Sequence, residues 1–302
     1  MAAPSPHLIV FATVGLLLGG LAASPGPSVL ATQTAEGVRP RRVVSFVPAV
    51  TEMLFAMGAG DRVVGVSSFD RFPAEVERLP KVGGLLDPQV ERVLSLRADL
   101  AVIYRSQHEL REQLNRAGIA QFEYVHRDLA DVTRTIREVG RTIGASAGAE
   151  RLAARIDRDL QVVRERAVGR TRPRTLLVFG RESGTLNRIL ASGGYGFLHD
   201  LLELAGANNV LSDVKRESVE LGVEAILARS PEVIIEVTYG RALTEAAQER
   251  AKRDWDQIPA VPAVRLRRIH LLQGDQFVIP GPRLVDAARR IQAALIARQS
   301  QN

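Results

Sequence analysis

Short apolar runs, each bounded by turn residues, recur along the chain from Arg42 onward. In the first half they cover 43–47, 63–66, 100–104 and 122–125. Runs of this length and composition are typical of strands buried on both faces. Helical patterns lie between them, over 51–57 and 110–117. Strands that alternate with helices predict a parallel sheet with helices on its faces, which is an α/β fold.

The second half of the chain repeats this pattern. Apolar runs over 175–179, 233–237 and 269–272 predict strands, and helical patterns cover 197–204, 223–228 and 284–297. The segment 90–103 also resembles 223–235: each is a short helix led by Val-Glu, followed by an acidic residue and an apolar strand. The sequence therefore predicts two α/β lobes related by pseudo-symmetry.

A long helix is predicted between the two lobes. No glycine or proline occurs between Gly148 and Gly169, so a helix of about 20 residues and roughly 30 Å fits there. An apolar stripe with helical spacing runs along it, made of Ala149, Leu152, Ile156, Leu160, Val163 and Ala167. Such a helix would hold the lobes as a stiff strut, whereas a glycine-rich linker would let them move independently.

The amino terminus carries an export signal in this interpretation. The run 8–23 is uncharged and apolar, and it is shorter than the ~20 residues that a bilayer span needs. Small residues allow cleavage after Ala23 or Ala31, although no basic residue precedes Leu8, so an uncleaved anchor is the alternative. We expect a periplasmic protein with this organisation: signal peptide 1–31, linker 32–40, amino-terminal lobe 41–145, connecting helix 146–169 and carboxy-terminal lobe 170–302.

Composition narrows the chemistry. The 302 residues contain no cysteine, which excludes thiolate zinc sites, iron–sulfur clusters, a cysteine nucleophile and a lipid-modified cysteine. The net charge is +6, yet the arginines are scattered among acidic residues, a pattern typical of a solvated mixed-sign surface. We therefore expect no nucleic-acid partner.

Catalytic and metal-binding motifs are weak or absent from the sequence. Ser67 lies in Gly-Val-Ser-Ser-Phe, which lacks the last glycine of a nucleophile elbow, and Ser212 begins an S-x-x-K match without companion motifs. No two histidines have metal-ligand spacing, and His126, just after a strand, is the best candidate for a ligand contact. No catalytic or metal-ligating residue is assigned, and a periplasmic enzyme that uses Ser67 or Ser212 stays the alternative of another class.

Three predicted strand ends share one chemistry. Each places an aromatic residue and an arginine where the strand gives way to a loop: Tyr104 with Arg105, Phe179 with Arg181, and Tyr239 with Arg241. Ligands of open α/β sheets bind beyond the carboxyl ends of the strands. Aromatic faces pack on a flat ring, and arginine forks hold carboxylates or phosphates. The pattern predicts a cleft for a large, partly anionic ligand, unless these are ordinary loop arginines in an arginine-rich chain.

The segments 42–52 and 64–69, the two Val-Glu helices and the strut together resemble a known family. They are similar to the periplasmic solute-binding proteins with a helical backbone, which serve ABC importers of cobalamin, ferric siderophores and haem. The resemblance runs from about Arg41 to Arg298. It implies two Rossmann-like lobes joined by one long α-helix, a ligand cleft between them, little hinge movement and a monomer that does no chemistry on its ligand.

The resemblance also implies a partner, namely an ABC importer permease with its ATPase. Family members dock through one exposed glutamate per lobe, and Glu91 and Glu224 occupy the matching positions. Charged rim contacts of this kind speed encounter and fix orientation. The alternative for Glu91 is a first-turn acid that is favoured by the helix dipole.

The ligand is expected to be a metal chelate, with no other cofactor. Cobalamin-binding relatives line the cleft with several tryptophans, whereas this chain has only Trp255. A corrinoid is the preferred ligand, and haem or a ferric siderophore is the alternative, with Tyr195, Tyr239 or His126 as a ligand of haem iron. The expected ligand-binding residues are Phe69, Leu85, Tyr104, Arg105, Arg181, Tyr239, Arg241, Asp275 and Phe277.

Overall fold

The computed structural model describes residues 39–240 and 242–297. The predicted signal peptide and all of the linker before residue 39 lie outside the described residues, as does Arg241. Within the described ranges, none of the helices combines the length and apolar character needed to cross a bilayer.

The order of elements follows the predicted alternation of strands and helices. The strands are β1 Val43–Ser45, β2 Val63–Val66, β3 Leu100–Tyr104, β4 Ala120–Tyr124, β5 Arg174–Gly180, β6 Ile189–Ser192, β7 Asn208–Asn209, β8 Ser218–Leu221, β9 Val233–Thr238 and β10 Ile269–Gln273. The α-helices are α1 Pro48–Ala56, α2 Val90–Ser95, α3 His108–Arg116, α4 Ala130–Thr142, α5 Ser146–Ala167, α6 Phe197–Leu204, α7 Val223–Arg229, α8 Glu245–Arg253, α9 Pro262–Arg265 and α10 Leu284–Ile296. Short 3-10 helices are η1 Gly60–Arg62, η2 Ala74–Arg78, η3 Asp254–Gln257 and η4 Asp275–Phe277.

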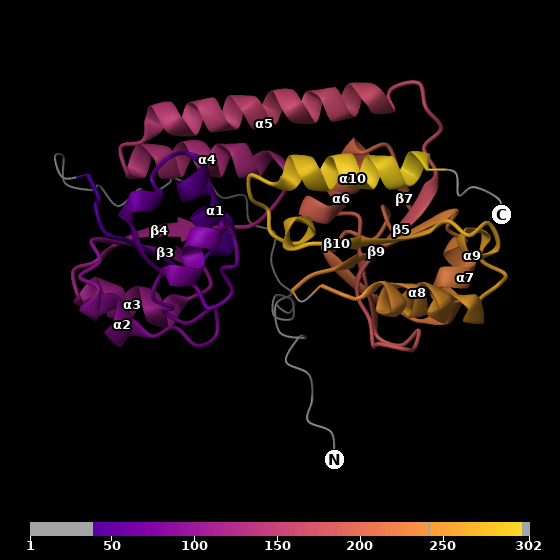
Figure 1. Cartoon of the computed structure of the whole chain (residues 1–302), viewed down its shortest axis with the longest axis horizontal. Helices are drawn as coiled ribbons and strands as arrows, with labels where there is room; N and C mark the ends of the chain where they lie inside the picture. The colour runs from indigo at the N-terminus through magenta and orange to yellow at the C-terminus, as the bar shows by residue number, and fades with distance from the viewer. Residues whose placement is uncertain (1–38, 241, 298–302) are drawn as a thin grey trace, which may run out of the picture. The chain divides into compact units, whose positions relative to one another are not determined.

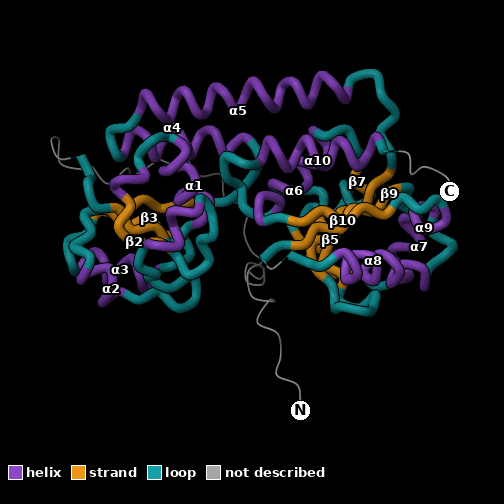
Figure 2. Tube along the Cα trace, in the orientation of Figure 1, coloured by secondary structure: helices purple, strands orange, loops and turns teal. Residues whose placement is uncertain are grey.

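The amino-terminal lobe is built on one parallel sheet with the strand order β2-β1-β3-β4. Figure 2 shows helices on both faces of this sheet. Alternate residues of β3 enter different cores: Leu100 and Val102 pack with α1, α4 and α5, whereas Ala101 and Ile103 pack with α2 and α3. Successive side chains of a strand point to opposite faces, so a sheet covered on both sides needs an unbroken apolar run.

The carboxy-terminal lobe has a mixed sheet with the order β10-β9-β5-β6-β8, and β7 pairs with β5. Its centre is parallel, as predicted, but β6 and β8 are antiparallel to their neighbours. These two strands were not predicted. Strand β8 is mostly half-exposed and contains Ser218 and Glu220, so it lacks the apolar run that marks a doubly covered strand.

Helix α5 connects the two lobes over 22 residues, which corresponds to about 33 Å. In Figure 1 it runs alongside α4 and then past α10. Its first half approaches α4 closely at Gly140, where a Cβ would lie 2.2 Å from that of Ala149. Its second half receives a hydrogen bond from Gln292 Nε2 to the Val163 carbonyl (2.8 Å).

One hydrophobic core therefore extends from the first sheet, along the buried stripe of α5, to the second sheet. The stripe contains the predicted residues from Ala149 to Val163. A continuous core on a stiff helix resists relative movement of the lobes, because any hinge would open close-packed contacts. The α/β class and the long helix are confirmed; the lobe boundaries at residues 145 and 169 stay a prediction.

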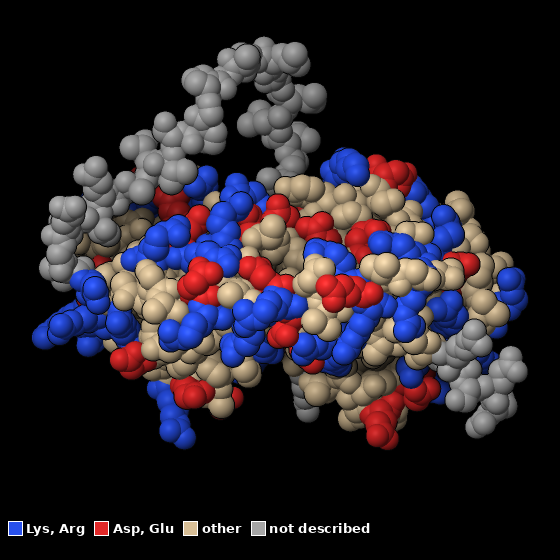
Figure 3. Space-filling view, turned by 90° about the horizontal axis from the view of Figure 1, so that it is seen from above, with Lys and Arg blue, Asp and Glu red and all other residues tan. Residues whose placement is uncertain are grey.

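The surface on the α5 side carries both signs of charge. Figure 3 views this side and shows basic and acidic side chains interspersed across it. Arg137 pairs with Glu150 (2.9 Å) and Asp157 (3.0 Å), and Arg289 lies 3.3 Å from Asp159. These pairs fit the mixed-sign surface that the sequence predicts, in which arginines are scattered among acidic residues.

Candidate functional site

A row of aromatic rings begins at the carboxyl end of the first sheet. Tyr104 ends β3 and Tyr124 ends β4, and the two residues are paired in the parallel register. Their rings meet edge to face, with centroids 5.9 Å apart. His126 stacks on Tyr124 at 6.5 Å and meets the Phe197 ring of α6 at 6.1 Å. Because Phe197 belongs to the other lobe, the row joins the strand ends of one lobe to the first turn of a helix in the other.

Burial sets the protonation of this row. It raises the pKa of Tyr104 and of Tyr124, so both phenols stay protonated at neutral pH and can donate hydrogen bonds. Burial also lowers the pKa of His126, with Asp128 opposing the shift, and favours a neutral imidazole. The Tyr124 hydroxyl lies 3.3 Å from His126 Nδ1. Because Tyr124 and Phe197 are buried in the core, half-buried Tyr104 and His126 are the members of the row that offer a ring face and a neutral polar group.

A second contact between the lobes is ionic. Arg283, just before α10, donates from Nε to Glu52 Oε2 (2.9 Å) and from NH2 to Oε1 (2.5 Å). Glu52 of α1 is only 3% exposed, and burial raises its pKa against the opposing effect of Arg283. The guanidinium also lies 4.3 Å from the ring centroid of Phe72. A bidentate, largely buried pair of this kind fixes both geometry and partner.

Asp70 lies near this pair and is 5% exposed. Burial raises the pKa of Asp70 to about 7, although the Thr51 hydroxyl and Lys81 oppose the shift. Thr51 donates instead to the Val47 carbonyl, and Lys81 Nζ donates to the backbone carbonyl of Asp70. Neither carboxylate oxygen accepts a hydrogen bond from any described residue. Because no donor of a described residue reaches these oxygens, desolvation is the dominant effect on the pKa of Asp70.

The loops beside the first sheet carry other predicted ligand-binding residues. Phe69 is 53% exposed. Leu85 lies half-buried in a loop, and its backbone carbonyl accepts a hydrogen bond from Gln107 Nε2 (3.1 Å). Gln107 Oε1 also accepts from the backbone N–H of Tyr104 (3.0 Å), so one side chain ties this loop to the end of β3. Arg105 is exposed and lies 3.4 Å from Glu123 on the neighbouring strand.

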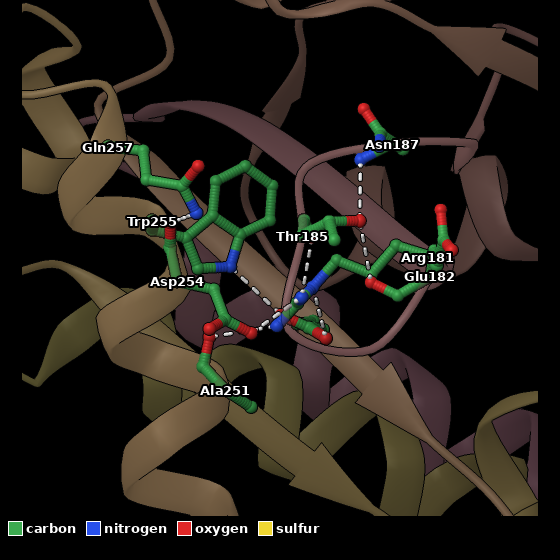
Figure 4. A network of polar contacts seen from close by, with 9 residues as sticks. Arg181, Glu182, Thr185, Asn187, Ala251, Asp254, Trp255 and Gln257 are labelled. Atoms are coloured by element: carbon green, nitrogen blue, oxygen red, sulfur yellow. Dashed lines mark hydrogen bonds and ion pairs between the residues drawn. The ribbon is translucent and has the colours of Figure 1, made fainter.

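Arg181 is not at a rim, so its prediction as a ligand-binding residue is wrong. Its side chain is 4% exposed and is surrounded by acceptors, as Figure 4 shows. Nε donates to Glu236 (2.9 Å), NH1 donates to Asp254 (2.8 Å), and NH2 donates to the Ala251 carbonyl (2.8 Å). Trp255 Nε1 donates to the other oxygen of Glu236 (2.9 Å). The guanidinium compensates two acidic side chains and has no face left for a ligand.

The remaining predicted residues follow β9 and β10. Phe277 is fully buried in the core, so its prediction as a wall of the cleft is wrong. Asp275 is half-buried, accepts a hydrogen bond from Gly240 N (2.7 Å) and adds negative charge near Glu52. Tyr239 is half-buried, and burial raises its pKa. The structure thus links the loops after β9 and β10, and it places Asp275 near the ionic contact between the lobes.

Sequence reasoning missed Tyr124 of the aromatic row and three residues that make contacts between the lobes, namely Phe197, Glu52 and Arg283. Tyr124 had a visible signal, because it lies in the apolar run 122–125, two residues before His126. Glu52 and Arg283 are separated by 231 residues, and nothing in either segment indicates the other.

The comparisons with known proteins agree with this architecture. The family model described as periplasmic binding protein matches residues 43–274. An uncharacterized ABC transporter substrate-binding lipoprotein of Bacillus subtilis (strain 168), YvrC, is 28% identical over 261 residues, 85% of this chain and 80% of that protein. A vitamin B12-binding protein of Pectobacterium carotovorum subsp. carotovorum (strain PC1) is 27% identical over 268 residues, 87% of this chain and 91% of that protein. The crystal structure of a periplasmic heme-binding protein from Pseudomonas aeruginosa superposes with a TM-score of 0.71 at 25% identity, covering 87% of this chain and 94% of that chain.

This chain belongs to the periplasmic binding protein family. The matched range includes the strands of both sheets and the whole of α5. The predicted family and its two-lobed α/β fold are therefore confirmed.

The predicted docking residues of this binding protein are exposed on both lobes. Glu91 is the second residue of α2, and Glu224 is the second residue of α7. A hollow of about 390 Å³ lies beside Glu224 and contains no aromatic side chain; its lining is Leu186, Asn187, Arg188, Glu220, Leu221, Gly222, Val223 and Glu224. We do not assign the ligand to this hollow, because it lies at the start of α7 and away from the aromatic row.

The described side chains that could bind a metal ion are dispersed. Among the residues that the structure describes, no three histidine, aspartate or glutamate side chains are arranged to hold a metal ion.

Proposed function

We propose that this binding protein captures a corrinoid outside the cytoplasm and delivers it to an ABC importer permease with its ATPase. The aromatic row from Tyr104 to Phe197 is the observation that carries the proposal. A corrinoid combines a broad ring system with peripheral amide groups. Aromatic faces suit the ring, and protonated phenols suit the amide oxygens. The relative from Pectobacterium carotovorum, which is named a vitamin B12-binding protein, supports the same ligand class.

The residues proposed to contact the ligand are those that the described structure keeps at the strand ends. From the sequence prediction these are Phe69, Leu85, Tyr104, Arg105, Tyr239 and Asp275, and the row adds half-buried His126, with buried Tyr124 and Phe197 packed behind it. Arg241 stays a sequence-based proposal. No residue is proposed to break or form a bond in the ligand, so the protein would act by binding and release alone.

Haem is the second candidate ligand, because a neutral imidazole is the form of histidine that binds iron. Burial favours that form in His126, and exposed Arg105 offers a partner for a propionate. The Pseudomonas aeruginosa relative is named a heme-binding protein.

Export by the signal peptide over 1–31, action in the periplasm as a monomer, and docking through Glu91 and Glu224 complete the proposal. The family and the relative named as an ABC transporter substrate-binding lipoprotein support an importer as the partner. Charge at the rim of such a contact would act mainly on the rate of association.

An absorbance titration of the mature protein with cyanocobalamin and with haemin tests the ligand. Saturable one-to-one binding of cyanocobalamin is expected, and Tyr104→Leu should weaken it about three- to tenfold, because an aromatic contact contributes roughly 0.5–1.5 kcal/mol beyond area. Phe55→Leu, a half-buried position in α1 outside the row, is the matched control.

The outcomes separate the two ligands. Haemin binding whose Soret band shift is lost in His126→Ala would replace the corrinoid by haem. Failure of both chelates to bind would overturn the proposal as a whole.

A further inference from the structure

Helices α2 and α7 present the same side chains to solvent in the two lobes. In each helix the fourth residue is fully buried, namely Val93 in α2 and Ile226 in α7. In each the fifth residue is an exposed leucine: Leu94 is 47% exposed and Leu227 is 40% exposed. The two helices therefore have the same rotation about their axes relative to the core.

Each exposed leucine lies one turn after a predicted docking glutamate. Residues three apart are neighbours on a helix surface, so Glu91 and Leu94 share one outer face of α2. Glu224 and Leu227 share the corresponding face of α7. A charged group beside an exposed branched apolar side chain thus occurs twice at equivalent places.

The two helices also lie on corresponding sides of their sheets. Val93 of α2 belongs to the core on the sheet face opposite α5, and Ile226 of α7 belongs to the equivalent core of the second lobe. In Figure 1 both helices lie on the side of the molecule away from α5. A partner that approaches from that side reaches both helices.

From this repetition we infer that Leu94 and Leu227 are apolar anchors of a two-point docking surface, each beside its glutamate. The inference rests on the proposed function, because the partner to which it commits is the importer permease. Two equivalent Glu-x-x-Leu faces fit a partner that presents one receptor surface twice, with an apolar depression and a basic side chain in each copy. The glutamates supply steering, and the desolvated leucines supply the contact that slows dissociation.

The two halves of this docking surface differ in shape. Beside Glu224 the hollow of about 390 Å³ is lined by Glu220 and Arg188 as well as by Val223. The carboxy-terminal half can therefore receive a protruding side chain of the permease. Its two glutamates make a basic protrusion the better fit.

The test uses the cyanocobalamin-loaded binding protein and the purified vitamin B12 importer of the same cell, with permease and ATPase together in lipid nanodiscs. Biolayer interferometry gives both rate constants. Leu94→Ser and Leu227→Ser should each raise the dissociation rate about tenfold, and the double variant should raise it about 100-fold, with association little changed. Val162→Ser is the matched control, since Val162 is 39% exposed but lies on α5, on the other side of the molecule.

The glutamates provide the contrasting variant. Glu91→Lys combined with Glu224→Lys should slow association, and this effect should shrink as salt is added. The leucine variants should show no such salt dependence. Thermal unfolding and cyanocobalamin affinity of the leucine variants should match wild type, because both side chains are exposed and far from the aromatic row.

The possible results distinguish the leucine anchors from the two-point arrangement and from the proposed delivery to the importer. If the double leucine variant dissociates like wild type while the glutamate variant binds poorly, the anchors are overturned and the proposed function stands. If only one single variant has an effect, the two-point arrangement is overturned. If the wild-type protein binds cyanocobalamin but not the importer, the proposed delivery fails, and the anchors fail with it.

Discussion

The two lobes share two hydrogen-bond arrangements at the amino ends of their strands and differ at the carboxyl ends. At the amino ends, Asp99 accepts hydrogen bonds from the backbone N–H groups of Arg41 and Arg42 (2.8 and 2.9 Å). In the second lobe, Glu232 accepts one from the N–H of Arg174 (2.8 Å). In both lobes a carboxylate just before a central strand holds the start of the neighbouring strand.

The arginines complete this correspondence. Arg42 donates to the Leu96 carbonyl at the end of α2, and Arg174 donates to the Arg229 carbonyl at the end of α7. Cationic groups near a helix carboxyl end satisfy its last carbonyls and interact favourably with the helix dipole. The amino ends of the strands, where no ligand contact is proposed, therefore have the same hydrogen-bond arrangement in both lobes.

At the carboxyl ends of the strands, the two lobes differ in how their buried acidic side chains are paired. The first lobe has protonated tyrosines and an uncompensated carboxyl, Asp70, near the end of its sheet. The second lobe has Glu236 and Asp254, both compensated by Arg181. The first lobe thus has a buried carboxyl that accepts no hydrogen bond from a described residue, whereas the second lobe pairs both of these acidic side chains with one arginine.

Removing the compensating charge should have the largest effect on stability. Arg181→Met leaves Glu236 and Asp254 without their cation, and breaking a buried pair in this way costs about 3–5 kcal/mol. Urea unfolding followed by circular dichroism measures the free energy of unfolding. Arg289→Met removes a half-exposed pair with Asp159 and should cost less than about 1 kcal/mol. Equal losses in the two variants would contradict the contrast between buried and surface pairs.

Asp70 should make the first lobe sensitive to pH in the opposite sense to a salt-bridged acid. Its pKa is raised from 3.8 to about 7, so the folded protein binds this proton more tightly than the unfolded chain does. Its contribution is fully present below about pH 4 and is lost as pH rises through about 7. The stability difference between Asp70→Asn and wild type should therefore shift in favour of the variant by up to about 4 kcal/mol between pH 4 and pH 8.

Urea unfolding at several pH values gives this difference directly. Asp61→Asn changes an exposed carboxylate in the same lobe and should follow the wild-type curve. A constant difference between Asp70→Asn and wild type across the range would show that Asp70 does not take up a proton on folding.

The sequence predicted the parts of this structure that depend on local pattern. Strand β3, helix α6 and the stripe of α5 were predicted within a residue or two, because their apolar spacing reports directly on burial. The prediction failed for Arg181, because the pattern of apolar and polar residues does not show that Glu236 and Asp254 both lie beside it. Glu236 is an acidic residue inside an apolar run, and that exception was the one local sign of a buried ionic network.

Two shared backbone positions should give the smallest effect and test the likeness of the lobes. Arg97 and Ser230 lie at the same junction between helix and strand, with φ of 48° and 46°. Left-handed backbone is disfavoured for residues with a Cβ, and glycine adopts it without that penalty. Arg97→Gly and Ser230→Gly should each raise the free energy of unfolding by about 0.5–1 kcal/mol, after the greater entropy of the unfolded glycine is deducted. Ala228→Gly, inside α7, should lower it by about 1 kcal/mol. If the glycines at 97 and 230 changed stability in opposite directions, the two junctions would be alike in geometry only, and the correspondence of the lobes would not extend to their energetics.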